Sequence, residues 1–376
     1  MKRNRMLTMV CALAGIFAAG VSDVRAQLPP VPAGATAIAQ GLFGPRGMRF
    51  APDGDLYVAL SGPGGSNSTA DICPQLQVPV AVGGPYTNGN TASIVKLDKK
   101  GNLTTVATGF PSALSQRPDV MGVADVAFLD GKLYAVISGG GCSHGSLTPN
   151  MVAKVDKKTG KWTMLANMSE AVAEYPAAHV APDFEADGVF YSMIPLNGKL
   201  YIVESNHGQI WSVTPKGKVE MVTDVSAVED HIVPTAAVPT LDGLLVGNLG
   251  LFPITPGSSV LLTLRSECSP LLAWLEHCDP GTMQVAGSSS PGLTTVVSMD
   301  WGPDGALYVL ELSDASGFPT PGYGKVVRIK NGLAQDVITG LSVPTGMTFG
   351  PDGALYVSNW GAADAPIGQI LRFNIH

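Results

Sequence analysis

Hydrophobic and polar positions along the chain follow one short pattern that recurs six times. Each copy has a strand-like lead-in, a turn that contains Asp-Gly or Asn-Gly, and then an apolar strand such as Leu56–Val58. An Asp or Asn side chain stabilises its own turn and Gly accepts positive φ, so each copy predicts a tight hairpin. The turns lie 45 to 77 residues apart, at Asp53-Gly54, Asp130-Gly131, Asn197-Gly198, Asp242-Gly243, Asp304-Gly305 and Asp352-Gly353.

Two further strands separated by a polar turn follow most copies, as in 93–98 with 103–107 and in 152–156 with 161–165. Six units of four short antiparallel strands predict an all-β fold, a six-bladed β-propeller that forms one domain over residues 27–376. The last blade has only three strands of its own, so we expect Ala35–Gln40 to supply its outer strand and close the ring. The expected blades are 44–108, 122–166, 188–223, 233–286, 295–339 and 343–376.

Three segments depart from the repeat. Met168–His179 is the one predicted helix, and Pro176 limits its length. The run 61–90, rich in Gly, Ser, Pro and Asn, predicts a long loop in blade one. The cysteine-bounded stretch 266–281 predicts an insertion in blade four.

The N-terminus has the order of a secretory signal. Basic residues at 2–5 precede the apolar run Met6–Val21, and small residues follow up to Ala26. We therefore expect residues 1–26 to be a signal peptide and the mature chain, starting at Gln27, to be secreted or periplasmic. No later run reaches the ~18 apolar residues of a membrane span, so we expect none in the mature chain.

The amino-acid composition and net charge limit the kinds of molecule that we expect this protein to bind. Only 14% of residues are charged, while 45 Gly and 29 Pro favour short strands and turns over long helices. The net charge is −7, and it becomes more negative without the basic leader. An acidic surface repels phosphate backbones and anionic membranes, so the expected partner is a small molecule or another exported protein.

Four cysteines remain beyond the predicted leader: Cys73, Cys142, Cys268 and Cys278. An even number in an oxidising compartment predicts disulfides, and three pairings are open. The predicted fold favours Cys268 with Cys278 and Cys73 with Cys142. A metal site is disfavoured because no Cys-x-x-Cys pair occurs.

Candidate binding residues come from aligning the six hairpins. The end of the second strand and the start of the first strand share one face near the axis, where propellers commonly bind ligands. Four oxygen-bearing side chains converging there could hold Ca²⁺ or another hard divalent cation, or a polar small molecule, or they could hydrogen-bond neighbouring loops. The aligned strand-two ends are Leu60, Ile137, Glu204, Asn248, Glu311 and Asn359, and the strand-one starts add Arg46, Asp125, Thr235 and Thr345.

Candidates for catalysis are weaker. His207 follows Glu204 at a strand end and is the best general-base candidate, with a role in loop hydrogen bonding as the alternative. Glu204 and Glu311 are the carboxylate candidates. His144, in the Gly-rich segment 139–145, indicates a flexible strand connection that could also face the pocket. No nucleophile elbow, phosphate loop, dinucleotide fingerprint or zinc-protease motif occurs.

Several phrases of the chain resemble the secreted six-bladed propeller family associated with biosynthesis of the pigment scytonemin. The matching stretches are 45–54, 174–176, 201–210, 233–235, 250–253 and 344–349. The resemblance covers essentially all of the mature chain. It implies the same fold and an association with a secondary-metabolite pathway, and it supplies no catalytic residues.

Three functions follow as hypotheses. The first is an exported propeller that binds a small molecule on its axial face, with an accessory role in a secondary-metabolite or carbohydrate pathway. The alternative is a metal-dependent lactonase or hydrolase of gluconolactonase type, for which the Glu and Asn ring would hold the cation. The third is a quinone-dependent sugar dehydrogenase, which would use Arg46 and His207.

Overall fold

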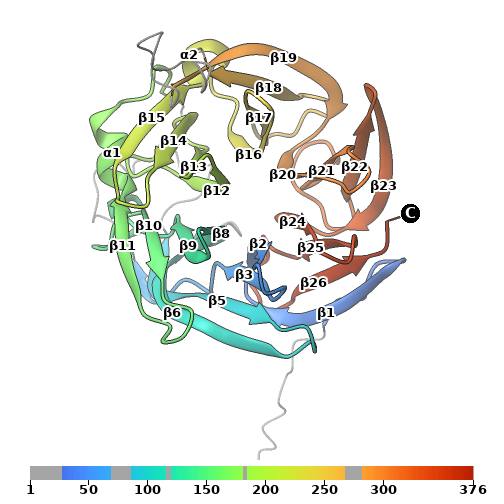
Figure 1. The fold of residues 1–376 in the computed structure, drawn as a ribbon, viewed down its shortest axis with the longest axis horizontal. Helices are drawn as coiled ribbons and strands as arrows, with labels where there is room; N and C mark the ends of the chain where they lie inside the picture. Colours follow the sequence, from blue (N-terminus) through green and yellow to red (C-terminus); the bar gives the residue numbers. More distant parts are fainter. Residues whose placement is uncertain (1–27, 69–85, 116–119, 181–183, 267–281, 376) are drawn as a thin grey trace, which may run out of the picture.

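The computed structural model describes residues 28–68, 86–115, 120–180, 184–266 and 282–375. Six antiparallel sheets stand around a central axis as the blades of a β-propeller (Figure 1). In each blade the first strand lies nearest the axis and the fourth lies at the perimeter. The predicted six-bladed fold is therefore confirmed.

The strands of blades one to three run in sequence order from the axis outward. Blade one comprises β2 (Pro45–Phe50), β3 (Leu56–Leu60), β5 (Thr87–Leu97) and β6 (Leu103–Leu114), with β4 (Asn67–Ser68) on β5 and β7 (Val120–Met121) on β6. Blade two comprises β8 (Val123–Leu129), β9 (Lys132–Ile137), β10 (Met151–Val155) and β11 (Trp162–Asn167). Blade three comprises β12 (Phe190–Leu196), β13 (Lys199–Glu204), β14 (Gln209–Val213) and β15 (Val219–Asp224).

Blades four to six repeat this order. Blade four comprises β16 (Pro234–Pro239), β17 (Gly243–Asn248), β18 (Ser259–Ser266) and β19 (Met283–Leu293). Blade five comprises β20 (Val296–Trp301), β21 (Leu307–Glu311), β22 (Gly324–Lys330) and β23 (Leu333–Leu341). Blade six comprises β24 (Gly346–Phe349), β25 (Leu355–Asn359), β26 (Gly368–Phe373) and, at its outer edge, β1 (Ala35–Leu42).

The N-terminal strand closes the ring as expected. β1 pairs with β26 from Ala35 opposite Phe373 to Leu42 opposite Gly368. At the axis, the Thr345 hydroxyl donates to the Pro45 carbonyl at 2.6 Å and the Ser358 hydroxyl donates to the Arg46 carbonyl at 2.6 Å. Blade six is thus joined to the start of the chain at both its outer and its inner edge.

The hairpin turns differ in one blade from the predicted pattern. In blade two, Asp130 and Gly131 both have positive φ (50° and 71°), as a two-residue hairpin requires. In blade four, Gly243 is not in that region and is already the first residue of β17, paired with Arg265. A Cβ on Gly243 would overlap the Leu264 carbonyl, so this glycine permits close approach of strands, and the prediction of a positive-φ Gly there is wrong.

Helical segments are short. α1 (Met168–Glu174) begins at Asn167, whose side chain accepts a hydrogen bond from the Glu170 amide. It ends before Pro176, five residues earlier than the predicted helix, because a residue before proline disfavours helical backbone. α2 (Ser226–Glu229) follows blade three, and the 3₁₀ turn η2 (Cys142–His144) lies in blade two.

The hydrophobic core is divided into clusters that lie largely between neighbouring blades. Trp211 and Tyr134, from blades three and two, are fully buried in one such cluster. Among the described residues, no helix is long and apolar enough to cross a membrane.

Candidate functional site

The innermost strands begin, and the second strands end, at one face of the disc. The connections 138–150, 249–258 and 312–323 also lie at this face. We call it the loop face. It carries the aligned residues that the sequence singled out.

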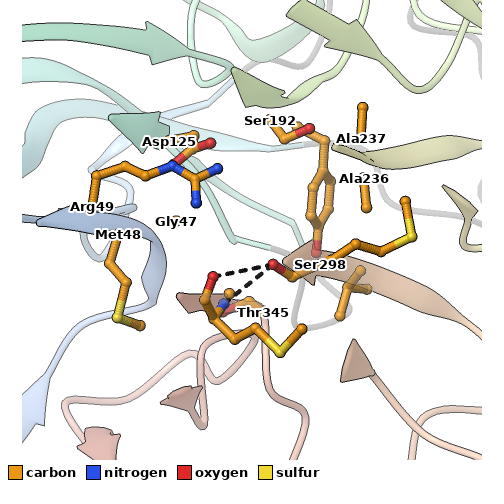
Figure 2. A pocket seen from close by; sticks show the side chains of 14 residues that line it. Gly47, Met48, Arg49, Asp125, Ser192, Ala236, Ala237, Ser298 and Thr345 are labelled. Carbon is orange, nitrogen blue, oxygen red and sulfur yellow. Dashed lines mark hydrogen bonds between the residues drawn. The ribbon is translucent and has the colours of Figure 1, made fainter. Parts of the chain in front are cut away.

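A narrow cavity lies on the axis, between the first halves of the innermost strands (Figure 2). Its volume is about 20 Å³. By the same measure one water molecule needs ~10–15 Å³, so the cavity holds one or two waters. Counted together with the open solvent at its mouth, the space is about 350 Å³. The polar side chains lining the cavity include Arg49, Asp125, Tyr191, Ser192, Ser298 and Thr345.

The innermost strands share a bulge near the loop face. In blades two to five the pairing register shifts directly after the first residue of the strand, and in blade one it shifts across Arg46 and Gly47. In a bulge the extra residue is unpaired, and its side chain points in a different direction from that of a regular strand residue. Arg46 and Tyr191 are the bulged residues of blades one and three.

The Arg46 guanidinium lies over the Tyr191 ring, 4.7 Å from its centroid. Tyr191 in turn packs against the cluster between blades five and six, so its ring spans the axial region. Arg46 is 9% exposed, and it makes no hydrogen bond or ion pair through its side chain with any described residue. Alignment of the strand starts predicted Arg46, but its contact with Tyr191 was not predicted.

Asp125 holds neighbouring innermost strands together. Its Oδ2 accepts from the Met193 amide of blade three at 3.0 Å, and its Oδ1 accepts from the Val126 amide at 2.8 Å. Burial raises the pKa of Asp125, while the positive charge of Arg49 opposes that rise. Thr235 has a comparable bridging role, because its hydroxyl donates to the Val296 carbonyl of blade five. These two predicted ligand residues thus link blades.

The ring at the ends of the second strands also has a common local role. Register confirms the alignment, since Glu204, Asn248 and Glu311 all pair with the first residue of their blade's innermost strand. Their side chains reach the connection that leads into that strand. Glu204 accepts from Val189, Glu311 from Thr294 and Asn359 from Ser342, and Asn248 donates to the Ile232 carbonyl.

Backbone amides already use most of the oxygens of the predicted cation site. The remaining Glu204 oxygen accepts from the His207 amide at 2.7 Å, and the Asn248 oxygen accepts from the Val260 amide at 2.6 Å. No hydrogen bond or ion pair in the described ranges joins any two of Glu204, Asn248, Glu311 and Asn359. In the same ranges, no group of three or more His, Cys, Asp or Glu could hold a metal ion. Asn248 and Asn359 are not among those residue types, so the hypothesis that the four residues hold a cation stays a prediction.

Glu311 is the exception within the ring. Its side chain is fully buried, and Oε2 has no hydrogen-bond partner in the described chain; the Lys325 ammonium lies 3.7 Å away. Burial raises the pKa of Glu311 to about 7, although the Thr294 amide and Lys325 act in the opposite direction. A buried carboxyl that titrates near neutrality is typical of functional sites, and also of strained structural positions.

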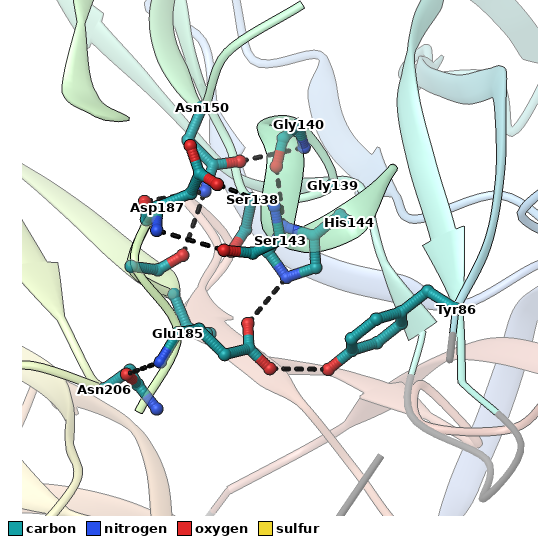
Figure 3. A network of polar contacts seen from close by, with 12 residues as sticks. Tyr86, Ser138, Gly139, Gly140, Ser143, His144, Asn150, Glu185, Asp187 and Asn206 are labelled. Carbon is teal, nitrogen blue, oxygen red and sulfur yellow. Dashed lines mark hydrogen bonds and ion pairs between the residues drawn. The ribbon is translucent and has the colours of Figure 1, made fainter. Parts of the chain in front are cut away.

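A second polar cluster lies at the loop face between blades one, two and three (Figure 3). Glu185 accepts from the Tyr86 hydroxyl at 2.7 Å and pairs with His144 Nε2 at 2.7 Å. His144 Nδ1 lies 2.6 Å from the Gly140 carbonyl, so this nitrogen is the donor. His144 is 0% exposed and belongs to η2, within the predicted connection between two strands.

His207 is part of the same region. It is 1% exposed, its Nε2 lies 2.8 Å from the Glu185 carbonyl, and its ring stacks on Phe184 at 4.5 Å. Since Nε2 faces a carbonyl, Nε2 is the donor of this hydrogen bond. Nδ1 is buried without a hydrogen-bond partner among the described residues. Sequence alone indicated the histidine, but not the distant carbonyl that its ring contacts.

Of the four cysteines, only Cys142, in η2, lies within the described residues. Cys73, Cys268 and Cys278 lie outside them, so the disulfide pairing stays a prediction. The expected loop 61–90 and the expected insertion 266–281 likewise lie largely outside the described residues.

Comparison with known proteins places the chain among β-propellers. No family model and no curated protein sequence matches it. A candidate gluconolactonase of known structure is 12% identical, with a TM-score of 0.51, over 93% of this chain and 95% of that one. A candidate oxidoreductase (glucose dehydrogenase) from Thermus thermophilus is 15% identical, with a TM-score of 0.53, over 90% and 98%. The PQQ-bound aldose sugar dehydrogenase of Streptomyces coelicolor is 13% identical, with a TM-score of 0.50, over 91% and 98%. At such identities the likeness concerns the fold.

Proposed function

We propose that the chain is a binding propeller that holds a small polar molecule over the axial cavity at the loop face. The supporting observation is a difference in hydrogen bonding between the polar residues that line the cavity and those at the ends of the second strands. Glu204, Asn248 and Asn359 bond the blades' own backbone, whereas Ser192 Oγ and the Arg49 guanidinium make no hydrogen bond within the described residues. Polar groups left unpaired at a concave site are available to a ligand.

The size of the cavity defines how the ligand is held. Only a group the size of one or two waters fits within the axis, so a hydroxyl or a carboxylate would enter and the body would remain at the mouth. This geometry suits a polyol or an organic acid better than an apolar molecule.

Binding can be tested by thermal unfolding with a panel of probes: glucose, sorbitol, gluconate, benzamide and benzoate. A ligand at a hundred times its Kd stabilises the folded state by about 2.7 kcal/mol. We expect at least one probe to raise Tm in the wild type and to lose that effect in Arg49→Gln. Arg265→Gln is the matched control, since Arg265 is an exposed residue of β18 that pairs with Asp242 and does not line the cavity. No shift with any probe would contradict the proposal.

We also propose that the protein acts outside the cytoplasm, because residues 1–26 have the order of a secretory leader. Expression of the full chain in a bacterium should give an exported product whose N-terminus is Gln27. A chain that stays in the cytoplasm with residues 1–26 attached would refute export.

Hydrolysis of a lactone is a second candidate, favoured by Glu311. Its Oε2, which accepts no hydrogen bond within the described residues, and its pKa of about 7 suit a general base, and one structural neighbour is a candidate gluconolactonase. We rank hydrolysis behind ligand binding, because the Glu311 side chain is completely buried and a substrate would have to reach it. The test is gluconolactone hydrolysis against pH: activity that rises near pH 7 and is lost in Glu311→Gln, but kept in Glu220→Gln, would support it.

A further inference from the structure

Arg46 differs from the arginines of the third strands in having no anionic partner among the described residues. Arg265 in β18, Arg328 in β22 and Arg372 in β26 each pair with an aspartate of the first hairpin of the same blade. Arg46 is only 9% exposed and makes no ion pair within the described residues. A guanidinium that has lost most of its water normally gains an anion in exchange.

The described surroundings of Arg46 leave its donors available. Tyr191 contacts the guanidinium through its ring, 4.7 Å from the centroid, which engages the flat face and leaves the N–H edge open to a ligand. Asp125, the one carboxylate among the residues lining the cavity, accepts backbone hydrogen bonds from Met193 and Val126 instead. This carboxylate therefore does not pair with Arg46.

The backbone departs from regular pairing at Arg46. The register shift across Arg46 and Gly47 is one residue, the same as at the bulges of blades two to five. Gly47 allows this course, because a Cβ there would overlap the Asp125 carboxyl. Arg46 is thus presented from a bulge and not from the regular ladder.

We propose that Arg46, which adjoins the cavity-lining residues Gly47 and Tyr191, is an anion subsite at the edge of the axial cavity and binds the carboxylate of an organic acid. This inference rests on the proposed binding function and names its ligand class. A guanidinium offers two parallel N–H donors that match a carboxylate, and the Tyr191 ring holds its plane. A planar monoanion also suits the site better than a multiply charged anion, because the Asp125 carboxyl lies against Gly47, the next residue.

The test compares acids with neutral analogues of the same shape. Calorimetric titration at constant ionic strength would use benzoate against benzamide and gluconate against sorbitol. We expect at least one acid to bind more tightly than its analogue, and Arg46→Gln to weaken that acid about tenfold or more while leaving the analogue unchanged. Arg46→Lys should recover only part of the affinity, because Lys cannot form the bidentate contact.

Arg265→Gln makes the same change of charge on β18, outside the residues that line the cavity, and should bind as the wild type does. Equal binding of acids and analogues, or acid binding unaffected by Arg46→Gln, would overturn the subsite while leaving the binding function intact. No binding by any of the four probes would overturn both. A Tm and a circular dichroism spectrum for Arg46→Gln, matched to the wild type, establish that the variant is folded.

Discussion

Gly47 shows at the scale of one residue how tightly the axis is packed. It has no positive φ, so its role is spatial: a Cβ there would overlap the Asp125 carboxyl. We predict that Gly47→Ala lowers the free energy of unfolding by about 1–3 kcal/mol, as overpacking does. Urea denaturation measures this. Gly287→Ala is the control, because nothing lies within 4 Å of a Cβ there, and an equal loss in both variants would contradict the steric reason.

Glu311 predicts a pH dependence of stability. Because its folded pKa is about 7 and its ordinary value is 4.5, the folded state binds more protons than the unfolded state between these values. The free energy of unfolding therefore falls as pH rises through this window, by about 3 kcal/mol. We predict that Glu311→Gln flattens the profile and is more stable than the wild type at about pH 8.

Thermal unfolding of both proteins between about pH 4.5 and 8 measures the effect. Glu220→Gln serves as a control of opposite sign. Hydrogen bonds from Lys218 and Lys199 lower the pKa of Glu220, so its contribution is present at neutral pH and is lost on acidification. Parallel profiles for the wild type and Glu311→Gln would show that Glu311 does not titrate as inferred.

At the scale of elements, buried polar contacts join connections that lie far apart in the chain. His144 and Glu185 are 41 residues apart, and Tyr86 and Glu185 are 99 apart. Burial lowers the pKa of His144, but the Glu185 carboxylate and the Gly140 carbonyl raise it more, so it lies above its ordinary value. The stabilising charge on His144 is therefore present below about pH 6.5 and is lost as pH rises through the raised pKa.

We predict that His144→Gln destabilises the protein by about 3–5 kcal/mol at pH 6, since it leaves the buried Glu185 carboxylate without its cationic partner, although the hydrogen bond from Tyr86 remains. His144→Gln combined with Glu185→Gln should be less destabilised than the sum of the two single variants. Denaturant titration of the three variants measures this. The exposed pair of His179 and Asp230, 3.4 Å apart, is the control: His179→Gln should change little. Additive losses would refute a coupled buried pair.

At the scale of the whole molecule, closure of the ring depends on β1. Without it, β26 becomes an unprotected sheet edge and blade six loses its outer strand. We predict that removing residues 28–42 from the mature chain lowers Tm strongly and promotes aggregation. A circular permutant that joins residue 375 to residue 35, with new ends at Lys158 and Thr159, keeps the pairing and should unfold near the wild-type temperature. A truncated chain as stable as the wild type would contradict this.

The fold was largely predictable because its signals are local. Each hairpin is encoded by a few consecutive residues, and the three-stranded last blade predicted that 35–40 would pair with the end of the chain, as β1 does with β26. The exception is instructive: Gly243 was assigned to a turn, but close packing against the Leu264 carbonyl requires it.

The site was predictable only in part. Aligning the hairpins placed Glu204, Asn248 and Glu311 at equivalent positions, and the register confirms this. The alignment did not reveal the hydrogen-bond partners of these side chains, which include backbone groups of the connections leading into the innermost strands. Tyr191 was missed altogether, although an alignment on the strand-one bulge would have set it level with Arg46.

The amino-acid sequence by itself determined the number of blades, the closing strand and the positions that share the loop face, because turn chemistry and alternation act between residues close in the chain. Only the tertiary structure decided which polar groups are satisfied and which are free. Asp125 meets an amide 68 residues away, and Arg46 meets a ring from a blade that is not its neighbour. Such pairings arise where strands distant in sequence converge on an axis, and local sequence preferences do not encode them.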